Sequence, residues 1–411
     1  MPKVIPYKAI RPIKEKVNLI VSKSLDNYSK NQLKNILEEN PISFLHILKS
    51  GYKKKQNVST KKRYLSVLER YKNFKEQGYF IQDNKPSFYI YKIITKNYTF
   101  CGIFAGVSTD DYKNNAIKKH ENTIHSRKTL FKKYLKTVRF NAEPVLLTYP
   151  DNTIINSIIN EVTSEEPEYK FIIDEKVTHH LWKLSANEKI VQIQNEFAKI
   201  KALYIADGHH RCASSYLLAE SLKAENSNHT GNEAYNYFMA YLIPESNLKI
   251  FEFNRLVKDL NGLSNEDFLS EVSQHFHIQN KGSKLFKPSK KHEFSMYLNG
   301  SFYSLTLNGS IYKFTDELSK LDVQILYLTI LNPILKIKNL KNNTRIEYGH
   351  GKNNINEMKK LVDKRKFAVA FGLFPIEVEE IKKIADKDLQ MPPKSTYIEP
   401  KLLSALTIYE L

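Results

Sequence analysis

The spacing of apolar residues along the chain predicts helices and strands that follow one another over most of its length. Residues 61–79 and 187–201 carry apolar side chains at the three- and four-residue spacing of an amphipathic helix, and the first run ends at Gly78, a typical helix stop. Residues 87–95 and 98–108 are rich in β-branched and aromatic side chains and predict the two strands of a hairpin.

Other segments extend this alternation. Further strands are predicted at 43–48, 142–151, 202–206, 235–245 and 248–257, with two more inside 168–185. Further helices are predicted at 24–40, before Pro41, and at 212–226. Residues 108–138 are predicted to be mostly helical, with a break near His120.

The alternation predicts a mixed α/β (α+β) fold, whose strand order cannot be read from one sequence. Changes in pattern suggest an N-terminal α/β region over residues 1–100, a central core over 101–260 and a C-terminal α+β region over 261–411. In the last region, residues 295–314 predict a β-meander that turns at Asn-Gly, and residues 391–403 predict a proline-rich loop.

Composition narrows the class of protein without naming a function. The chain has 411 residues, of which 41% are hydrophobic and 26% charged, as in a globular protein with a sizeable core. It has no apolar run long enough to cross a bilayer and no apolar signal segment at its start. Its two cysteines, Cys101 and Cys212, are too few for a disulfide scaffold or a four-cysteine zinc site. We therefore expect a cytoplasmic protein without a membrane partner.

The net charge of +19 raises the question of a nucleic-acid partner. The basic residues are mostly lysines, spread along the whole chain and interleaved with Asn, Ile and Tyr, with no long basic tail. This distribution favours a compositional bias over a binding surface, so we expect no nucleic-acid partner.

The sequence "YIADGHHRC", residues 204–212, concentrates polar side chains where a predicted strand gives way to a helix. The unpaired backbone N–H groups of a first helical turn bind anions, phosphate above all. Gly208 allows a tight turn or the close approach of a ligand, while His209, His210 and Arg211 add donors. Asp207 can hold a metal ion, orient a histidine or accept a proton. The alternative is that Asp207 only caps the helix and the histidines pack or face water.

A second segment, "KKHENTIH" at residues 118–125, resembles the zinc motif H-E-x-x-H but has one residue too many. On a helix, residues five apart diverge, so His120 and His125 make a poor zinc pair. Glu121 could instead act as a general base with His120 beside it. A solvated helix start capped by Thr123 is the competing interpretation.

Two further groups are weaker signals. In "MPPKST", residues 391–396, a rigid proline pair presents Lys394, Ser395 and Thr396, which suits a phosphate or substrate contact. Taken alone, the segment is better explained as a surface turn. The neighbours His179 and His180 lie on a predicted strand, where alternation sends one of them inward. A core histidine with its hydrogen bonds satisfied is the simpler account.

Four motifs occur in order along nearly the whole chain: "NPISFLHIL", "AIKKHENT", "LYIADGHHR" and "MPPKSTYIEPKLLSAL". Together they resemble a bacterial family labelled as a domain of unknown function, some of whose members have been proposed as ATP-dependent serine kinases. The D-G-H-H-R element also resembles the phosphate-binding loop of the ParB/sulfiredoxin superfamily. That superfamily includes kinases that phosphorylate free L-serine and nucleotide-dependent DNA-partition proteins.

The resemblance implies a ParB/sulfiredoxin-like core with additional α+β elements, acting as a free-serine kinase with ATP or ADP and Mg²⁺. Gly208, His209, His210 and Arg211 would hold the nucleotide phosphates, and Asp207 would bind Mg²⁺ or orient a histidine. Glu121 would accept the proton of the serine hydroxyl, with His120 beside it, while Lys394, Ser395 and Thr396 would close over substrate or phosphate.

The sequence departs from this family's pattern at several positions. Cys212 replaces an aromatic residue after D-G-H-H-R, Ala405 replaces the last glycine of the terminal motif, and Arg127 stands without the usual Asp beside it. Two alternatives stay open: a ParB-like nucleotide-dependent DNA-binding module, and a protein that binds a phosphorylated metabolite without turnover. The sequence predicts small-molecule substrates and leaves the oligomeric state open.

Overall fold

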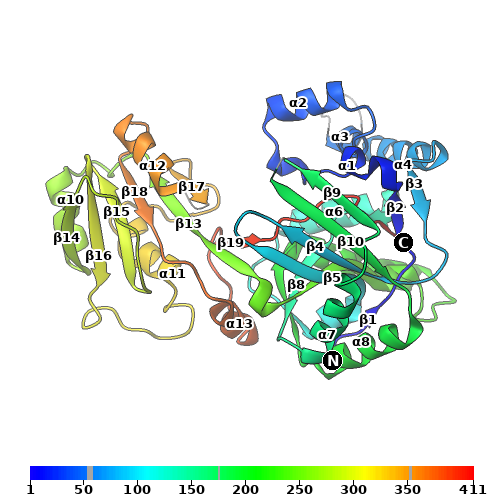
Figure 1. Ribbon diagram of the computed structural model, residues 1–411. Helices are drawn as coiled ribbons and strands as arrows, with labels where there is room; N and C mark the ends of the chain where they lie inside the picture. The colour runs from blue at the N-terminus through cyan, green and yellow to red at the C-terminus, as the bar shows by residue number, and fades with distance from the viewer. Residues whose placement is uncertain (53–58, 175, 351–353) are drawn as a thin grey trace. The chain divides into compact units, whose positions relative to one another are not determined.

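The computed structural model describes residues 1–52, 59–174, 176–350 and 354–411, and contacts between residues divide the chain into two units (Figure 1). The first unit takes in residues 1–119, 123–248 and 400–411, and the second takes in residues 120–122 and 249–399. The mixed α/β class expected from the sequence is confirmed, while the division into 1–100, 101–260 and 261–411 stays a prediction.

The first unit is built on a mixed sheet in which the strand order is β6-β11-β8-β12-β5-β4-β10-β9, with β1 paired to β5. Its strands are β1 Val4–Ile5, β4 Phe88–Ile94, β5 Thr99–Ser108, β6 Ile117–Lys118, β8 Val145–Tyr149, β9 Tyr169–Ile173, β10 Val177–Leu184, β11 Leu203–Asp207 and β12 Tyr237–Pro244. The predicted hairpin is confirmed, since β4 and β5 pair antiparallel. Strand β11 runs antiparallel to β8 and parallel to β6.

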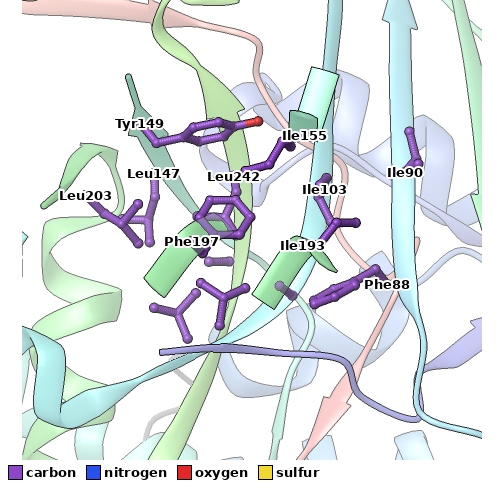
Figure 2. Close-up of a cluster of buried hydrophobic side chains, with 14 of the residues drawn as sticks. Phe88, Ile90, Ile103, Leu147, Tyr149, Ile155, Ile193, Phe197, Leu203 and Leu242 are labelled. Atoms are coloured by element: carbon purple, nitrogen blue, oxygen red, sulfur yellow. The ribbon is translucent and has the colours of Figure 1, made fainter. Parts of the chain in front are cut away.

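One hydrophobic core lies between this sheet and two helices, α7 (Thr153–Thr163) and α8 (Asn187–Lys199). Figure 2 shows Ile155 of α7 and Phe197 of α8 meeting Leu147 and Leu242 of the central strands. These helices form because their apolar residues recur at helical spacing, and α7 is capped by Asn152, whose side chain accepts the backbone N–H of Ile155.

Among its described residues, the first unit has seven further α-helices, and one of them lies where a strand was predicted. They are α1 Val17–Ile20, α2 Lys30–Glu39, α3 Leu45–Tyr52, α4 Thr60–Glu76, α5 Thr109–Lys113, α6 His125–Val138 and α9 His209–Glu225. The prediction of a strand at 43–48 is wrong, because these residues lead into helix α3 and form its first turn. Its apolar side chains Phe44, Ile47 and Leu48 share one helical face and pack with Val67 of α4. A short apolar run fits either a buried strand or a buried helix.

The segment around His120 is less helical than predicted. Between α5 and α6 the chain forms the short strand β6 and then an irregular stretch up to Ile124. The expected break near His120 is therefore confirmed but is much longer than a kink. His120 lies outside any helix, and His125 is the first residue of α6, so the two do not form a zinc pair on one helix.

The last residues of the chain close the first unit. Strand β20 (Tyr409–Glu410) pairs with β7 (Phe140–Asn141), and Ile408 exchanges backbone hydrogen bonds with Ile10 of β2 (Ile10–Pro12), which itself pairs with β3 (Phe80–Gln82). Ile408 and Ala405 are fully buried in the same cluster as the α3–α4 helices. Segments from both ends of the sequence therefore share one core.

The second unit holds its own sheet, with strand order β14-β16-β15-β18-β13-β17 and with β19 paired to the first half of β13. Its elements are β13 Lys249–Val257, α10 Asn265–Ser273, β14 Phe276–Gly282, β15 Glu293–Leu298, β16 Ser301–Leu307, α11 Asp322–Leu326, β17 Ile346–His350, α12 Asn354–Asp363, β18 Val369–Gly372, α13 Val378–Asp386 and β19 Thr396–Glu399. Helix α12 packs against β13, β17 and β18 (Figure 1).

Two predictions for this unit need correction. The Asn299-Gly300 turn forms as expected and joins β15 to β16, with both residues at positive φ. The meander has no third strand, because residues 308–314 form turns and irregular backbone. The predicted loop 391–403 contains strand β19, whose pairing partner β13 lies more than a hundred residues away and leaves no local signal.

In the described residues, no helix is both long enough and apolar enough to cross a membrane.

Candidate functional site

Asp207 occupies an irregular position at the end of β11. Ile205 pairs with Leu147 of β8, but Asp207 pairs with Leu146, so Ala206 is an extra residue that forms a bulge. In a regular strand Asp207 would point to the same face as Ile205, which lies in the hydrophobic core. Bulges redirect side chains and are common beside active sites. The bulge therefore accounts for a carboxylate that is 44% exposed at the end of a buried strand.

Gly208 makes the step from β11 into α9. It has φ +97°, a conformation that L side chains rarely adopt, and a Cβ there would lie 3.0 Å from Nε of Arg211. The positive φ therefore favours glycine at this turn, and the missing side chain leaves room for Arg211 to lie over it. No side-chain cap is formed at Gly208, so the amides of the first turn of α9 keep their affinity for an anion.

Arg211 is the centre of a small charged cluster. Its Nη1 donates to the carbonyl oxygen of Pro144 at 2.6 Å, and its guanidinium lies 3.7 Å from a carboxylate oxygen of both Glu143 and Asp207. Lys401 Nζ lies 3.4 Å from Asp207 on its other side. Two acids and two bases therefore alternate around the first turn of α9, all of them partly exposed.

The surroundings of Asp207 determine its charge. Partial burial favours the neutral acid, but the positive charges of Arg211 and Lys401, together with the hydrogen bonds that Asp207 accepts from Lys401 and the Gly208 backbone, outweigh burial and lower the pKa of Asp207. Asp207 is therefore an anion at neutral pH. It can pair with a cation or accept hydrogen bonds, but it is a weak general base.

Sequence analysis predicted Asp207 and Arg211 but missed Glu143 and Lys401. Glu143 precedes the buried strand β8, and Ser404 Oγ donates to it at 3.1 Å. Lys401 and Ser404 belong to the terminal motif "MPPKSTYIEPKLLSAL", and the presence of that motif was the one available signal. Glu143 and Lys401 stand in no local sequence pattern that points to the site, because strand pairing and the returning C-terminal segment bring them together.

The two histidines lie in α9 itself, which begins about one turn earlier than predicted. His209 is buried and His210 is half-buried. Cys212 is fully buried in the core, where burial raises the pKa of its thiol, and its backbone N–H donates to the Gly208 carbonyl at 3.0 Å. Cys212 is therefore an unreactive packing residue, and the replacement of an aromatic residue there changes the core rather than the charged cluster.

A magnesium ion would find few protein ligands here. Within the part of the chain that the structure describes, no three His, Cys, Asp or Glu side chains are grouped to hold a metal. Mg²⁺ bound with a nucleotide needs only one or two carboxylates, because phosphate oxygens and waters complete its shell. Asp207 and Glu143, on either side of Arg211, fit that modest requirement.

The remaining predicted site residues gather in the second unit. The backbone N–H of Met391 donates to the His120 carbonyl at 2.9 Å, which joins the "HEN" segment to the start of "MPPKST". His120 is buried and Glu121 is partly exposed. Sequence analysis expected both segments at the site without predicting this direct bond between them.

Lys394, Ser395 and Thr396 differ in what they can offer. Lys394 is exposed and has φ +58°, while Ser395 is buried and its Oγ donates to the Pro392 carbonyl at 2.6 Å, which stabilises the loop. Thr396 begins β19 and pairs with Glu252 of β13. The predicted residues therefore form two clusters, Asp207–Arg211 in the first unit and His120, Glu121 and Lys394–Thr396 in the second.

The histidine pair on β10 is a structural feature, as expected. His179 is buried, its Nδ1 lies 2.7 Å from the hydroxyl of Tyr91, and its ring stacks with those of Tyr91 and Phe171. Burial lowers its pKa to about 4, so the ring is neutral at physiological pH. His180 is only partly buried, in keeping with strand alternation.

Comparison with known proteins gives one family match and several distant structures. No curated protein matches the sequence. The structure titled "Free serine kinase in complex with AMP" has a TM-score of 0.36 and 13% identity, over 76% of this chain and 95% of that chain. SbnI with C-terminal truncation from Staphylococcus aureus has a TM-score of 0.38 and 11% identity, over 74% and 87% of the two chains. A conserved hypothetical protein from Pyrococcus furiosus has a TM-score of 0.33 and 12% identity, over 72% and 90%.

The family model of DUF1015, described as a protein of unknown function, matches residues 4–324. This match covers most of the 411 residues and includes the bulged strand, the Gly208 turn and the first turn of α9. The chain therefore belongs to the DUF1015 family.

Proposed function

We propose that this protein is a small-molecule kinase that transfers a phosphoryl group from ATP or ADP to the hydroxyl of free L-serine, giving O-phosphoserine. The observation that carries the proposal is the junction of β11 and α9. There an uncapped helix N-terminus, the Gly208 turn, the Arg211 guanidinium and the ionised Asp207 lie together. The four motifs quoted above supply the choice of serine. The proposal does not rest on the solved structures, whose TM-scores lie below 0.4.

Phosphoryl transfer depends on positioning and charge neutralisation more than on covalent catalysis. The backbone amides at the start of α9, with Gly208, His209 and His210, would hold the nucleotide phosphates, and Arg211 would grip one of them in bidentate fashion. Arg211 and Lys401 are held to Asp207 at 3.4–3.7 Å, long for ion pairs, so a phosphate can compete for them. We also infer that this part of the chain is a ParB/sulfiredoxin-like core.

The acidic residues would have two roles: Asp207 and Glu143 would bind a cation, and Glu121 would act as a base. Asp207 and Glu143 would repel a bare phosphate, and Mg²⁺, when bound with the nucleotide, would supply the charge that removes this repulsion. The serine hydroxyl would attack the terminal phosphorus. The new P–O bond replaces the bond to the departing nucleotide, and Glu121 takes the hydroxyl proton, with His120 beside it. Lys394, Ser395 and Thr396 would contact substrate or transferred phosphate.

The test is an assay of purified full-length protein with ATP or ADP, Mg²⁺ and a panel of free amino acids, read by mass spectrometry. We expect phosphoserine from serine alone, with the rate reduced at least about 100-fold in Asp207→Asn and in Glu121→Gln. Asp174→Asn and Glu347→Gln are matched controls, since both residues are exposed acids outside the two clusters, and they should keep the wild-type rate.

Absence of any phosphorylated product with either nucleotide would overturn the proposal. Nucleotide binding without turnover, detected as a ligand-dependent thermal shift, would select the non-catalytic binding protein instead. Binding to duplex DNA with a steep salt dependence and no phosphoserine would select the DNA-binding module.

A further inference from the structure

Arg255, on β13 in the second unit, is a buried cation with no acidic partner. Its side chain is among the largest fully buried ones in the protein, with 1% of the residue exposed. Its guanidinium donates to two backbone carbonyls, those of Phe253 and of Lys394, the latter at 3.1 Å, and it lies 5.5 Å from the centre of the Tyr348 ring. In the residues that the structure describes, no carboxylate forms a salt bridge with it.

Lys394 adds a second positive charge, on the loop whose backbone Arg255 binds. Its Nζ lies 5.3 Å from the centre of the Phe253 ring, and Phe253 is two residues before Arg255, on the same face of β13. Lys394 is exposed, and it too forms no salt bridge across the described ranges. The bond from Arg255 to the Lys394 carbonyl holds a residue whose φ of +58° is unfavourable for lysine, so Arg255 fixes where the Lys394 side chain begins.

The strand register surrounds these cations with aromatic rings. Arg255 lies directly opposite Tyr348 of β17, and Phe253 lies opposite His350. Strand β19 continues along β13 and places Tyr397 against His350, with ring centroids 3.8 Å apart and planes at 10°. We call Phe253, Tyr348, His350 and Tyr397, with Arg255 and Lys394, the cationic–aromatic face.

A buried cation that has no acidic partner, with a second cation on the loop it binds, is unfavourable unless an anion compensates the charge. Burial lowers the pKa of Arg255 to about 10, which still leaves it charged at neutral pH. Carbonyl oxygens and the Tyr348 ring compensate that charge only partly, because neither carries a full negative charge. Removing the partner of a buried charge is strongly unfavourable, so the arrangement is poised for an anionic group from outside the chain.

A cleft elsewhere in this unit provides a useful contrast. It is lined by Lys291, His292, Lys320 and other polar side chains. There Lys291 pairs with Glu377 and Glu380, and Lys320 pairs with Glu317. Within the described ranges, two of the three lysines that line this cleft are therefore matched by acids of the chain, and the third, Lys383, is not. Among the described residues, neither cation of the cationic–aromatic face has an acid matched to it.

We propose that the cationic–aromatic face binds the phosphate group of a small phosphorylated ligand, with Arg255 and Lys394 supplying the charge and the rings forming its walls. Two positive charges match a phosphate dianion better than a carboxylate, and arginine and lysine are the usual phosphate partners. The inference deepens the proposed function, on which it rests for the choice between a nucleotide and O-phosphoserine. It adds Arg255 and the rings, which no sequence motif indicated, to the role proposed for Lys394.

The experiment measures how well a ligand protects Lys394 from acetylation. Full-length protein is treated with an amine-acetylating reagent, and modification of Lys394 and Lys364 is measured by peptide mass spectrometry. The ligands are inorganic phosphate, AMP and O-phosphoserine, each compared with sodium chloride at equal ionic strength. We expect at least one phosphate compound to slow acetylation of Lys394 three-fold or more and to leave Lys364, an exposed lysine of the same unit, unchanged. The most protective compound identifies the source of the phosphate.

Variants test whether Arg255 is responsible. Arg255→Met should abolish the protection, and Arg255→Lys should weaken it by raising the half-protecting concentration about ten-fold. Arg345→Met, which removes an arginine paired with Asp259, should leave it intact. If Arg255→Met does not fold, Arg255→Lys alone decides. Equal acetylation of Lys394 with and without every phosphate compound overturns the inference, as does full protection in the arginine variants.

The outcome is separable from that of the kinase assay. Asp207→Asn is expected to lower turnover at least about 100-fold but to keep the protection of Lys394, because Asp207 is not one of the residues of the cationic–aromatic face. Protection of Lys394 without phosphoserine formation would therefore contradict the kinase proposal alone. Phosphoserine formation without protection of Lys394 would contradict only the inference about the cationic–aromatic face.

Discussion

At the scale of single residues, Asp83 is a buried acid of the first unit that accepts hydrogen bonds from three side chains. Arg11 Nε and Nη2 donate to its two oxygens at 2.8 and 2.9 Å, Tyr89 donates at 2.6 Å, and Lys183 lies 2.7 Å away. Arg11 and Asp83 are both almost fully buried. Burial alone would raise the pKa of Asp83, but the hydrogen bonds from Arg11, Lys183 and Tyr89 outweigh it and lower the pKa to about 2.

We predict that Asp83→Asn lowers the free energy of unfolding at pH 7 by about 3–5 kcal/mol, because it removes the buried acid that pairs with both Arg11 and Lys183 and leaves Arg11 with the more exposed Glu168 as its acidic partner. The measurement is urea denaturation of the wild type and the variant. Asp174→Asn, an exposed acid paired with Lys23, is the control and should change stability by less than about 0.5 kcal/mol. A loss below 1 kcal/mol for Asp83→Asn would contradict the assignment.

The same pair of proteins tests the pH dependence. The pKa of Asp83 is about 2 in the folded state and 3.8 in an unperturbed chain, so the unfolded state takes up the proton first as the pH falls. This stabilisation is complete above about pH 4 and is lost as the pH falls through 2, at about 1.4 kcal/mol per pKa unit. The difference between wild type and Asp83→Asn should therefore shrink below pH 4.

At the scale of elements, Ala405 has a backbone conformation that favours glycine, the residue that the family resemblance leads us to expect at this position. Ala405 has φ +65°, lies in the segment before β20, and is fully buried among residues such as Phe140 and Ile408. Its backbone N–H donates to the Ala142 carbonyl at 2.9 Å, directly before Glu143. A left-handed conformation costs an L residue roughly 1–2 kcal/mol, and glycine avoids that cost.

We predict that Ala405→Val destabilises the protein by about 2–4 kcal/mol, whereas Ala405→Gly changes stability by less than about 1 kcal/mol. Valine adds overpacking, typically 1–3 kcal/mol, to a β-branched side chain at positive φ. Glycine relieves the backbone but loses about 0.8 kcal/mol of methyl burial and about 0.5–1 kcal/mol of chain entropy. Thermal denaturation of both variants decides, and equal losses would show that packing alone matters.

How far the sequence predicts these elements depends on whether the determining contacts are local. The helices at 61–79 and 187–201 form as α4 and α8, since each carries a long apolar face within its own sequence. The stretch 43–48 became a helix because packing against α4 decided between two structures that its short apolar run allows. Strand β19 could not be predicted, since its partner is distant in sequence.

The same reasoning applies to the candidate sites. The Asp207–Arg211 junction was predicted as a strand-to-helix step, because both neighbouring elements are local and strongly patterned. The bulge at Ala206 depends on the register with β8, and Glu143, Lys401 and Arg255 reach their positions through long-range pairing. Such residues carry no periodicity or motif of their own, so only a structure identifies them.

At the scale of the whole molecule, neither unit is formed by one continuous stretch of the chain. The chain leaves the first unit for residues 120–122, returns, leaves again at Lys249 and comes back for residues 400–411. That last segment supplies Lys401 to the charged cluster, Ser404 to Glu143, and Ile408 to the core beside β2. The first unit is therefore incomplete without residues 400–411.

We predict that deletion of residues 400–411 loosens the first unit and leaves the second intact. The deletion opens the backbone bonds of β2 and β7 and removes fully buried side chains such as Leu406 and Ile408. Hydrogen exchange read by mass spectrometry should become at least about 100-fold faster in peptides covering β2 and β7, with no change in peptides covering β15 and β16. A synthetic peptide of residues 400–411 added in trans should restore part of the protection. Unchanged hydrogen exchange in β2 and β7 would show that residues 400–411 do not stabilise the first unit. Equally faster exchange in β15 and β16 would show that the two units fold as one.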